Sequence, residues 1–248
     1  SVELIRLGPP LHLAGAVPAV VVLFLNAKVA RLSGMESLAT LRVVATINQL
    51  VAFAPSALAA TFLSQLASVR GSAGNVPTTH FLRYLRLIVA SATATALATA
   101  TIKFPLVRAI FGAKYEASAS LLDLGLISIT LIVVKQSLVV GLVSERRTGY
   151  ALTDSLVTTL TAGALGQLLI PQLQAEGYLL AELFGHLAAL ILMLVIFSRR
   201  LRGEGRGREL LVALCVLLAG TAMLAASYLT RESGRHLLPL GLGLLVLL

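Results

Sequence analysis

The sequence is poor in charged residues and in cysteine. Only 12% of its 248 residues are charged, compared with about 25% in a typical soluble domain. The single cysteine, Cys215, has no intramolecular disulfide partner and no neighbours at metal-ligand spacing. The stretches between its apolar runs are short and leave no room for an extramembrane domain. These shortages argue against a soluble protein, a disulfide-stabilised fold and a metal site.

Apolar sequence fills the chain instead. Hydrophobic residues make up 57% of it, and the mean hydropathy is +0.92. The apolar runs are about 20 residues long, which is enough for a helix to cross roughly 30 Å of hydrocarbon. They do not alternate between apolar and polar residues, so the spans are helices rather than barrel strands. The sequence predicts an all-α polytopic membrane protein with about eight transmembrane helices.

Turn residues divide the apolar runs. Gly34 should separate the first two spans, and Pro171 should end the fifth. The segment Ala90–Thr101 is rich in Ala, Ser and Thr, which allow close helix contacts, so it should pack inside the bundle. The chain begins at Ser1 rather than Met and stops inside an apolar run, so we expect a fragment with a truncated last helix. The expected spans are approximately residues 9–31, 37–67, 80–104, a run within 104–150, 149–170, 177–199, 209–230 and one that starts near 236.

The charge of the chain is strongly positive. Twenty Lys and Arg residues against eleven Asp and Glu residues give a net charge of +9. A nucleic-acid-binding protein would gather these charges on one soluble face, whereas here they lie in short clusters between apolar runs. The pattern therefore favours attraction to anionic lipid or phosphate over binding to nucleic acid.

Ionisable side chains inside the apolar runs need partners. A lysine at the centre of a membrane helix costs roughly 2.5–3.5 kcal/mol, so Lys135 should face protein, water or a substrate. Folding the chain back about Arg146 brings Lys135 near Asp154, and a buried ion pair is the favoured interpretation. Contact with a substrate phosphate and snorkelling to the interface are the alternatives. Glu182 and His186 lie four residues apart and should form a local pair rather than a proton relay.

Three segments resemble motifs of a known transporter family. The first starts at Leu25-Asn26 and turns at Gly34 into the next helix. The second, Phe111–Ala117, is similar to the family's F-G-x-x-Y-x-x-A loop before a long helix. The third, Leu169–Pro171 followed by Glu176–Ala181, is similar to its L-I-P hairpin. In this order they resemble the multidrug/oligosaccharidyl-lipid/polysaccharide (MOP) exporter superfamily, and more closely its lipid-linked oligosaccharide flippase branch.

The resemblance implies a two-lobed transporter that alternates between inward-open and outward-open states. Residues 1–202 would form its C-terminal lobe of about six helices, and residues 203–248 an additional helix pair whose last helix is truncated. The N-terminal lobe of the same chain would be its missing partner. Such a protein would be a multi-pass protein of the bacterial inner (cytoplasmic) membrane.

The substrate that the resemblance implies is an isoprenoid-diphosphate-linked glycan, moved from the cytoplasmic to the periplasmic leaflet. Binding and release would require no catalytic residue, cofactor or metal. Basic side chains would contact the diphosphate, and the alternative role for them is anchoring to lipid headgroups. Amide side chains would contact the sugar hydroxyls, and the alternative role for them is hydrogen bonding between helices. The candidate substrate-binding residues are Asn26, Lys28, Arg42, Asn48, Gln49 and Lys135.

Two other functions compete with a flippase. A multidrug extruder of the same superfamily would favour acidic residues for cationic substrates, whereas this sequence offers basic ones. A membrane-embedded glycan polymerase or ligase would carry long extracytoplasmic loops with acid and base residues, and the loops here are short. We therefore expect a transporter and not an enzyme.

Overall fold

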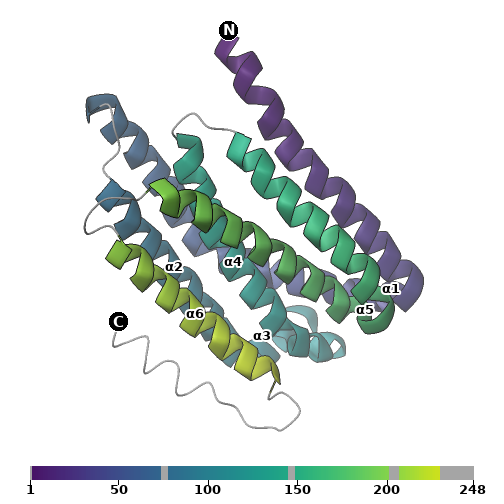
Figure 1. Ribbon diagram of the computed structural model, residues 1–248. Coiled ribbons are helices and arrows are strands. Elements are labelled where there is room, and N and C mark those ends of the chain that lie inside the picture. Colours follow the sequence, from purple (N-terminus) through teal and green to yellow (C-terminus); the bar gives the residue numbers. More distant parts are fainter. Residues whose placement is uncertain (1, 74–77, 145–148, 201–206, 230–248) are drawn as a thin grey trace.

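The computed structural model describes residues 2–73, 78–144, 149–200 and 207–229, and these ranges are almost entirely helical. The predicted all-α fold is confirmed. The elements in chain order are α1 (Val2–Ala73), α2 (Thr78–Thr101), α3 (Lys103–Phe111), the 3₁₀ helix η1 (Ala113–Ser118), α4 (Ala119–Ser144), α5 (Gly149–Arg200) and α6 (Gly207–Leu229) (Figure 1).

The two longest helices, α1 and α5, each fold back on themselves. In α1 the backbone reverses at Gly34 (φ 82°, ψ 171°), a conformation that glycine adopts readily because it has no Cβ. The predicted turn at Gly34 is confirmed. In α5 the backbone reverses at Gln174 (φ 54°, ψ −124°), so the prediction that this span ends at Pro171 was wrong. A proline removes only one helical hydrogen bond, and a neighbouring donor can replace it in a membrane helix.

The two hairpins double the number of membrane-length segments. Among the described residues, two segments in α1, one each in α2 and α4, and two in α5 give six membrane-length segments before Arg200. Helix α6 adds a further apolar helix. The expected span that starts near His236 lies outside the described residues. The division into a six-helix lobe and an additional helix pair stays a prediction.

The connection between α2 and α4 differs from the predicted one. The third span was expected to continue to Phe104, but α2 ends at Thr101, and Ile102 (φ −111°, ψ 15°) bends the chain into α3. At nine residues, α3 is roughly 14 Å long and too short to cross a membrane. Helix α3, η1 and the reversals at Gly34 and Gln174 lie at one end of the bundle, which we call the turn end (Figure 1).

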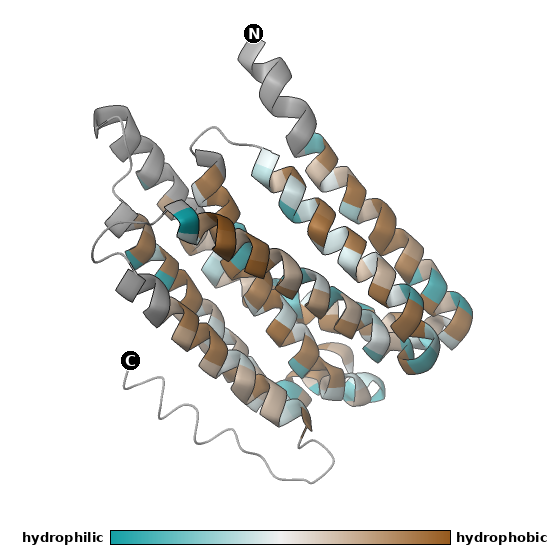
Figure 2. Ribbon diagram, in the orientation of Figure 1, coloured by the Kyte–Doolittle hydropathy of each residue, from teal (hydrophilic) through white to brown (hydrophobic). Residues whose placement is uncertain are grey.

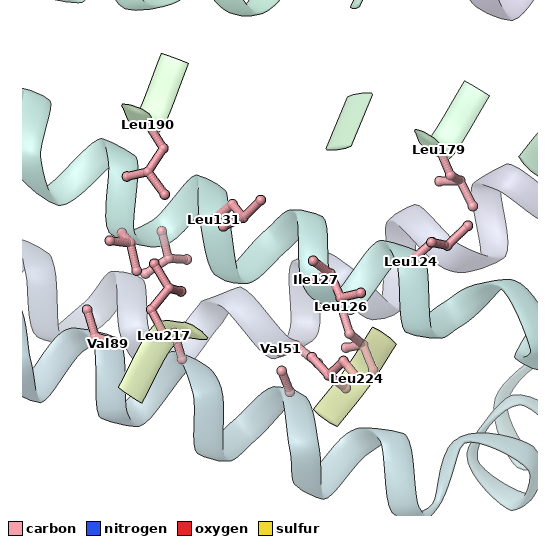
Figure 3. Packing of buried hydrophobic residues seen from close by; sticks show 14 of the residues in the cluster. Val51, Val89, Leu124, Leu126, Ile127, Leu131, Leu179, Leu190, Leu217 and Leu224 are labelled. Atoms are coloured by element: carbon pink, nitrogen blue, oxygen red, sulfur yellow. The ribbon is translucent and has the colours of Figure 1, made fainter. Parts of the chain in front are cut away.

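Helix α4 lies at the centre of the bundle. It packs against α1, α2, α5 and α6, and its leucines 122, 126, 138 and 142 are fully buried. Figure 3 shows Leu126, Ile127 and Leu131 of α4 among apolar side chains from the surrounding helices. The predicted interior packing of the small-residue segment in α2 is confirmed, because Ala92, Thr93, Ala96 and Ala100 are buried.

The outside of the bundle is also apolar. Leu23, Phe53 and Leu160 are 67%, 76% and 68% exposed, and Figure 2 shows hydrophobic residues on the outer sides of the long helices. A soluble monomer rarely exposes such continuous apolar surface. Together with the six membrane-length segments, this surface describes a membrane-spanning helical bundle.

Candidate functional site

The interface between α1 and α5 depends on glycines of α5. The first halves of the two helices run parallel, as their contacts from Ala14–Ser155 to Lys28–Gln167 show. A Cβ at Gly166 would lie only 2.7 Å from Leu25 Cδ2. Because glycine has no side chain, the helices approach closely here. A long side chain of α1 can therefore reach the backbone of α5.

Lys28 makes this contact near the turn end. Its Nζ donates one hydrogen bond to the backbone carbonyl oxygen of Gln167 at 3.0 Å and one to the Gln167 Oε1 at 2.6 Å. Both acceptors are neutral, so the bonds orient the half-buried ammonium without cancelling its charge. In the part of the chain that the structure describes, no carboxylate forms an ion pair with Lys28. The site therefore retains a positive charge that can bind an anion.

Arg42 lies on the other half of the α1 hairpin, close to the same end. Its side chain is exposed, and its charge acts on Tyr178 in the second half of α5. Lys28 thus contacts the first half of the α5 hairpin, and the charge of Arg42 lies within electrostatic reach of its second half. Of the two predicted amides in this region, Asn26 is half-buried and Gln49 is exposed. The structure leaves these four side chains at or near the surface of α1.

Asn48 has a different environment. It points toward α4, where a Cβ at Gly125 would lie 2.7 Å from its Nδ2. The side chain therefore packs at a contact between helices, but its buried Oδ1 has no hydrogen-bond partner among the described residues, so the interhelical hydrogen bond also stays a prediction. Contact of Asn48 with a sugar stays a prediction.

Lys135 lies in the interior, and its predicted pair with Asp154 is confirmed. Its Nζ is 2.8 Å from Asp154 Oδ2 and 3.1 Å from Thr158 Oγ1. Asp154 and Gln167 are both in the first half of α5, 13 residues apart, which corresponds to about 20 Å along the helix. The structure therefore separates Lys135 from the Lys28 site. Its contact with a substrate stays a prediction.

A second buried ion pair was missed by the sequence analysis. Lys103 at the start of α3 pairs with Asp123 near the start of α4, and Ser227 Oγ of α6 donates to the same Asp123 oxygen at 3.2 Å. The pair fixes α3 against α4 at the turn end. The sequence does contain a signal for this pair: Asp123 is a lone acidic residue at the start of a long apolar run, where a carboxylate needs a basic partner.

The expected pair between Glu182 and His186 is wrong. Tyr178, one turn earlier on the same face of α5, donates its hydroxyl proton to Glu182 Oε1 at 2.9 Å. His186 lies instead within electrostatic reach of Lys135, and no Glu182–His186 ion pair forms among the described residues. Within the same ranges, no three His, Cys, Asp or Glu side chains gather into a metal-binding group.

The fold and its apolar outer surface define a polytopic helical membrane protein. Among solved structures, the chain is similar to one described as "Lipid II flippase MurJ, inward closed conformation", with a TM-score of 0.69 at 13% sequence identity. The likeness covers 94% of this chain and 50% of that chain, so this chain spans about half the length of the flippase. No family model and no curated protein sequence matches it. The chain therefore shares the helical fold of that structure over about half of the structure's length, as its motifs led us to expect.

Proposed function

We propose that this chain is part of a flippase that moves an isoprenoid-diphosphate-linked oligosaccharide across the bacterial cytoplasmic membrane. The observation that carries the proposal is the ammonium of Lys28, which lies in a membrane-length helix and is held by two neutral oxygens. An ionisable residue of a membrane helix that no opposite charge neutralises is a default candidate for a functional site. The fold, similar to that of a lipid II flippase, supports the transporter class.

Each predicted site residue has a role in this proposal. Lys28 and Arg42 bind the diphosphate oxygens, because charge-assisted hydrogen bonds to phosphate are strong. Asn26 and Gln49 offer hydrogen bonds to sugar hydroxyls. Asn48 and Lys135, which contact α4 and α5 in this conformation, join the site in a state of the cycle that separates these helices.

Transport in this proposal is binding and release by alternating access. The N-terminal lobe of the same chain forms the opposite wall of the cavity, and the two lobes rock around the bound headgroup. The cations replace part of the water that the diphosphate loses on entry, while the isoprenoid tail stays in the lipid. No covalent step is required.

The test is the binding and transport of a polyprenyl diphosphate by the intact protein in lipid nanodiscs and proteoliposomes. We expect Lys28→Gln and Arg42→Gln each to weaken binding by about tenfold or more, because each removes a charge-assisted hydrogen bond. Transport should fall in parallel. Lys114→Gln is the matched control, because Lys114 is an exposed lysine of η1 at the same end of the bundle.

Two results would contradict the proposal. One is unchanged binding and transport in both variants. The other is equal binding of a polyprenol without the diphosphate, which would mean that the protein recognises the lipid tail alone.

A further inference from the structure

Two prolines interrupt the helical hydrogen bonding at the α1–α5 interface, one at each end. In an α-helix, a backbone carbonyl accepts from the N–H four residues later, and proline has no N–H. Pro18 therefore leaves the carbonyl of Ala14 in α1 without its usual donor, and Pro171 does the same to the carbonyl of Gln167 in α5. An unmet carbonyl is costly in a membrane helix, so each needs a donor from elsewhere.

Each open carbonyl is met by a side chain of the opposite helix. Ser155 Oγ of α5 donates to the carbonyl oxygen of Ala14 at 2.7 Å, and Lys28 Nζ of α1 donates to that of Gln167 at 3.0 Å. A neutral hydroxyl thus satisfies the carbonyl at one end of the interface, and a charged ammonium satisfies it at the other. Because the neutral hydroxyl of Ser155 is sufficient to satisfy the open carbonyl at its end of the interface, the charge of Lys28 is not needed to join the two helices.

The side chain of Gln167 supplies the second acceptor for Lys28, at 2.6 Å. An ammonium has three N–H donors, and these two bonds leave the third available to a ligand. Lysine is otherwise a flexible side chain that loses much rotamer freedom when it binds. Ordering it in advance lowers that cost for an incoming anion.

We propose that Pro171 and Gln167 are positioning residues for Lys28. The carbonyl opened by Pro171 and the amide of Gln167 hold the ammonium so that its third N–H meets an oxygen of the substrate diphosphate. The inference rests on the proposed function, because it takes Lys28 as a phosphate-binding residue. Helix α5 thereby contributes to the substrate site through a residue of α1.

The first test is Pro171→Ala in the intact protein. The new backbone N–H restores the helical bond to the Gln167 carbonyl and competes with Lys28 for that acceptor. We expect the affinity for a polyprenyl diphosphate to fall by about threefold to tenfold, and no further fall when Pro171→Ala is added to Lys28→Met. Pro18→Ala is the matched control, because it makes the same change at the end where the donor is the neutral Ser155. It should leave the affinity unchanged.

The second test needs no substrate. An amine-reactive ester acylates accessible lysine amines, and it does so more slowly where hydrogen bonds hold the amine. Mass spectrometry gives the rate for each lysine. Lys28 should react several times faster in Pro171→Ala than in the wild type or in Pro18→Ala, with the exposed Lys114 as an internal reference. If Pro171→Ala lowers the yield of folded protein, Gln167→Met removes the Oε1 acceptor alone and should give the same direction of change.

The outcomes separate this inference from the proposed function. An unchanged acylation rate of Lys28 in Pro171→Ala and Gln167→Met overturns the positioning role, even if the wild type binds the diphosphate. Equal effects of Pro171→Ala and Pro18→Ala overturn it as well. A wild-type protein that does not bind the diphosphate overturns the proposed function, and the acylation rates still decide whether Pro171 and Gln167 hold Lys28.

Discussion

Lys28 and Lys135 both lie in membrane-length helices and both reach across to α5, but their partners differ. Lys135 is 5% exposed and forms an ion pair with the carboxylate of Asp154. Lys28 is half-buried, near the turn end, and is held by the two oxygens of Gln167. The carboxylate neutralises the charge of Lys135, whereas the neutral oxygens only orient the ammonium of Lys28.

The difference follows from depth. Taking a charge into a low-dielectric interior costs several kcal/mol, so a buried ammonium needs an opposite charge beside it. Lys28 is half-buried and lies six residues before Gly34, about 9 Å along the helix from the turn, so water or headgroups can share the solvation of its charge. The deep lysine is therefore suited to holding helices together, and the shallow one to receiving an anion.

The largest expected effect comes from giving Lys135 a neutral partner like that of Lys28. In Asp154→Asn the buried ammonium loses its counter-charge, and we expect the free energy of unfolding to fall by about 3–5 kcal/mol. Denaturant or thermal unfolding of the intact protein in detergent measures this. The double variant Lys135→Met/Asp154→Leu is the control, because replacing both charges by apolar groups should recover most of the loss. Equal losses in the single and double variants would show that the pair contributes through packing alone.

A smaller effect is the expected difference in stability between the same substitution made at each of the two lysines. Lys28→Met should cost about 1–2 kcal/mol, since it removes hydrogen bonds to neutral oxygens at a partly exposed site. Lys135→Met should cost about 3–5 kcal/mol, since it leaves the Asp154 carboxylate buried and unpaired. Unfolding of both variants under one set of conditions gives the comparison. Similar losses would contradict the distinction between the two sites.

The pair of Lys135 with Asp154 could be predicted because each charge interrupts one of two apolar runs that are consecutive in the sequence. Folding the chain back between these runs sets the two at similar depth. The Gly34 turn was predictable for a related reason, because glycine adopts positive φ at little cost. In both cases the signal lies in neighbouring segments of the chain.

The other contacts depend on information that neighbouring segments do not carry. Lys103 resembles a loop lysine in the sequence, and it is buried only because the chain bends at Ile102. Lys28 and Gln167 are 139 positions apart, so their contact depends on which helices become neighbours. The spacing of Gln167 and Pro171 marks an open carbonyl, but the donor that meets it is known only once α1 is placed beside α5.

The smallest effect on stability, and the sharpest on function, is expected from giving Lys28 a charged partner like that of Lys135. Gln167→Glu keeps the shape of the acceptor and adds a negative charge, so the free energy of unfolding should change by less than about 1 kcal/mol at this partly exposed site. The affinity for a polyprenyl diphosphate should nevertheless fall by about tenfold or more, because the carboxylate cancels the charge that attracts the phosphate. Gln172→Glu is the matched control, because it adds the same charge to an exposed position of α5 in the following turn. If both variants weaken binding equally, the phosphate responds to the overall charge of the turn end and not to the ammonium that Gln167 holds.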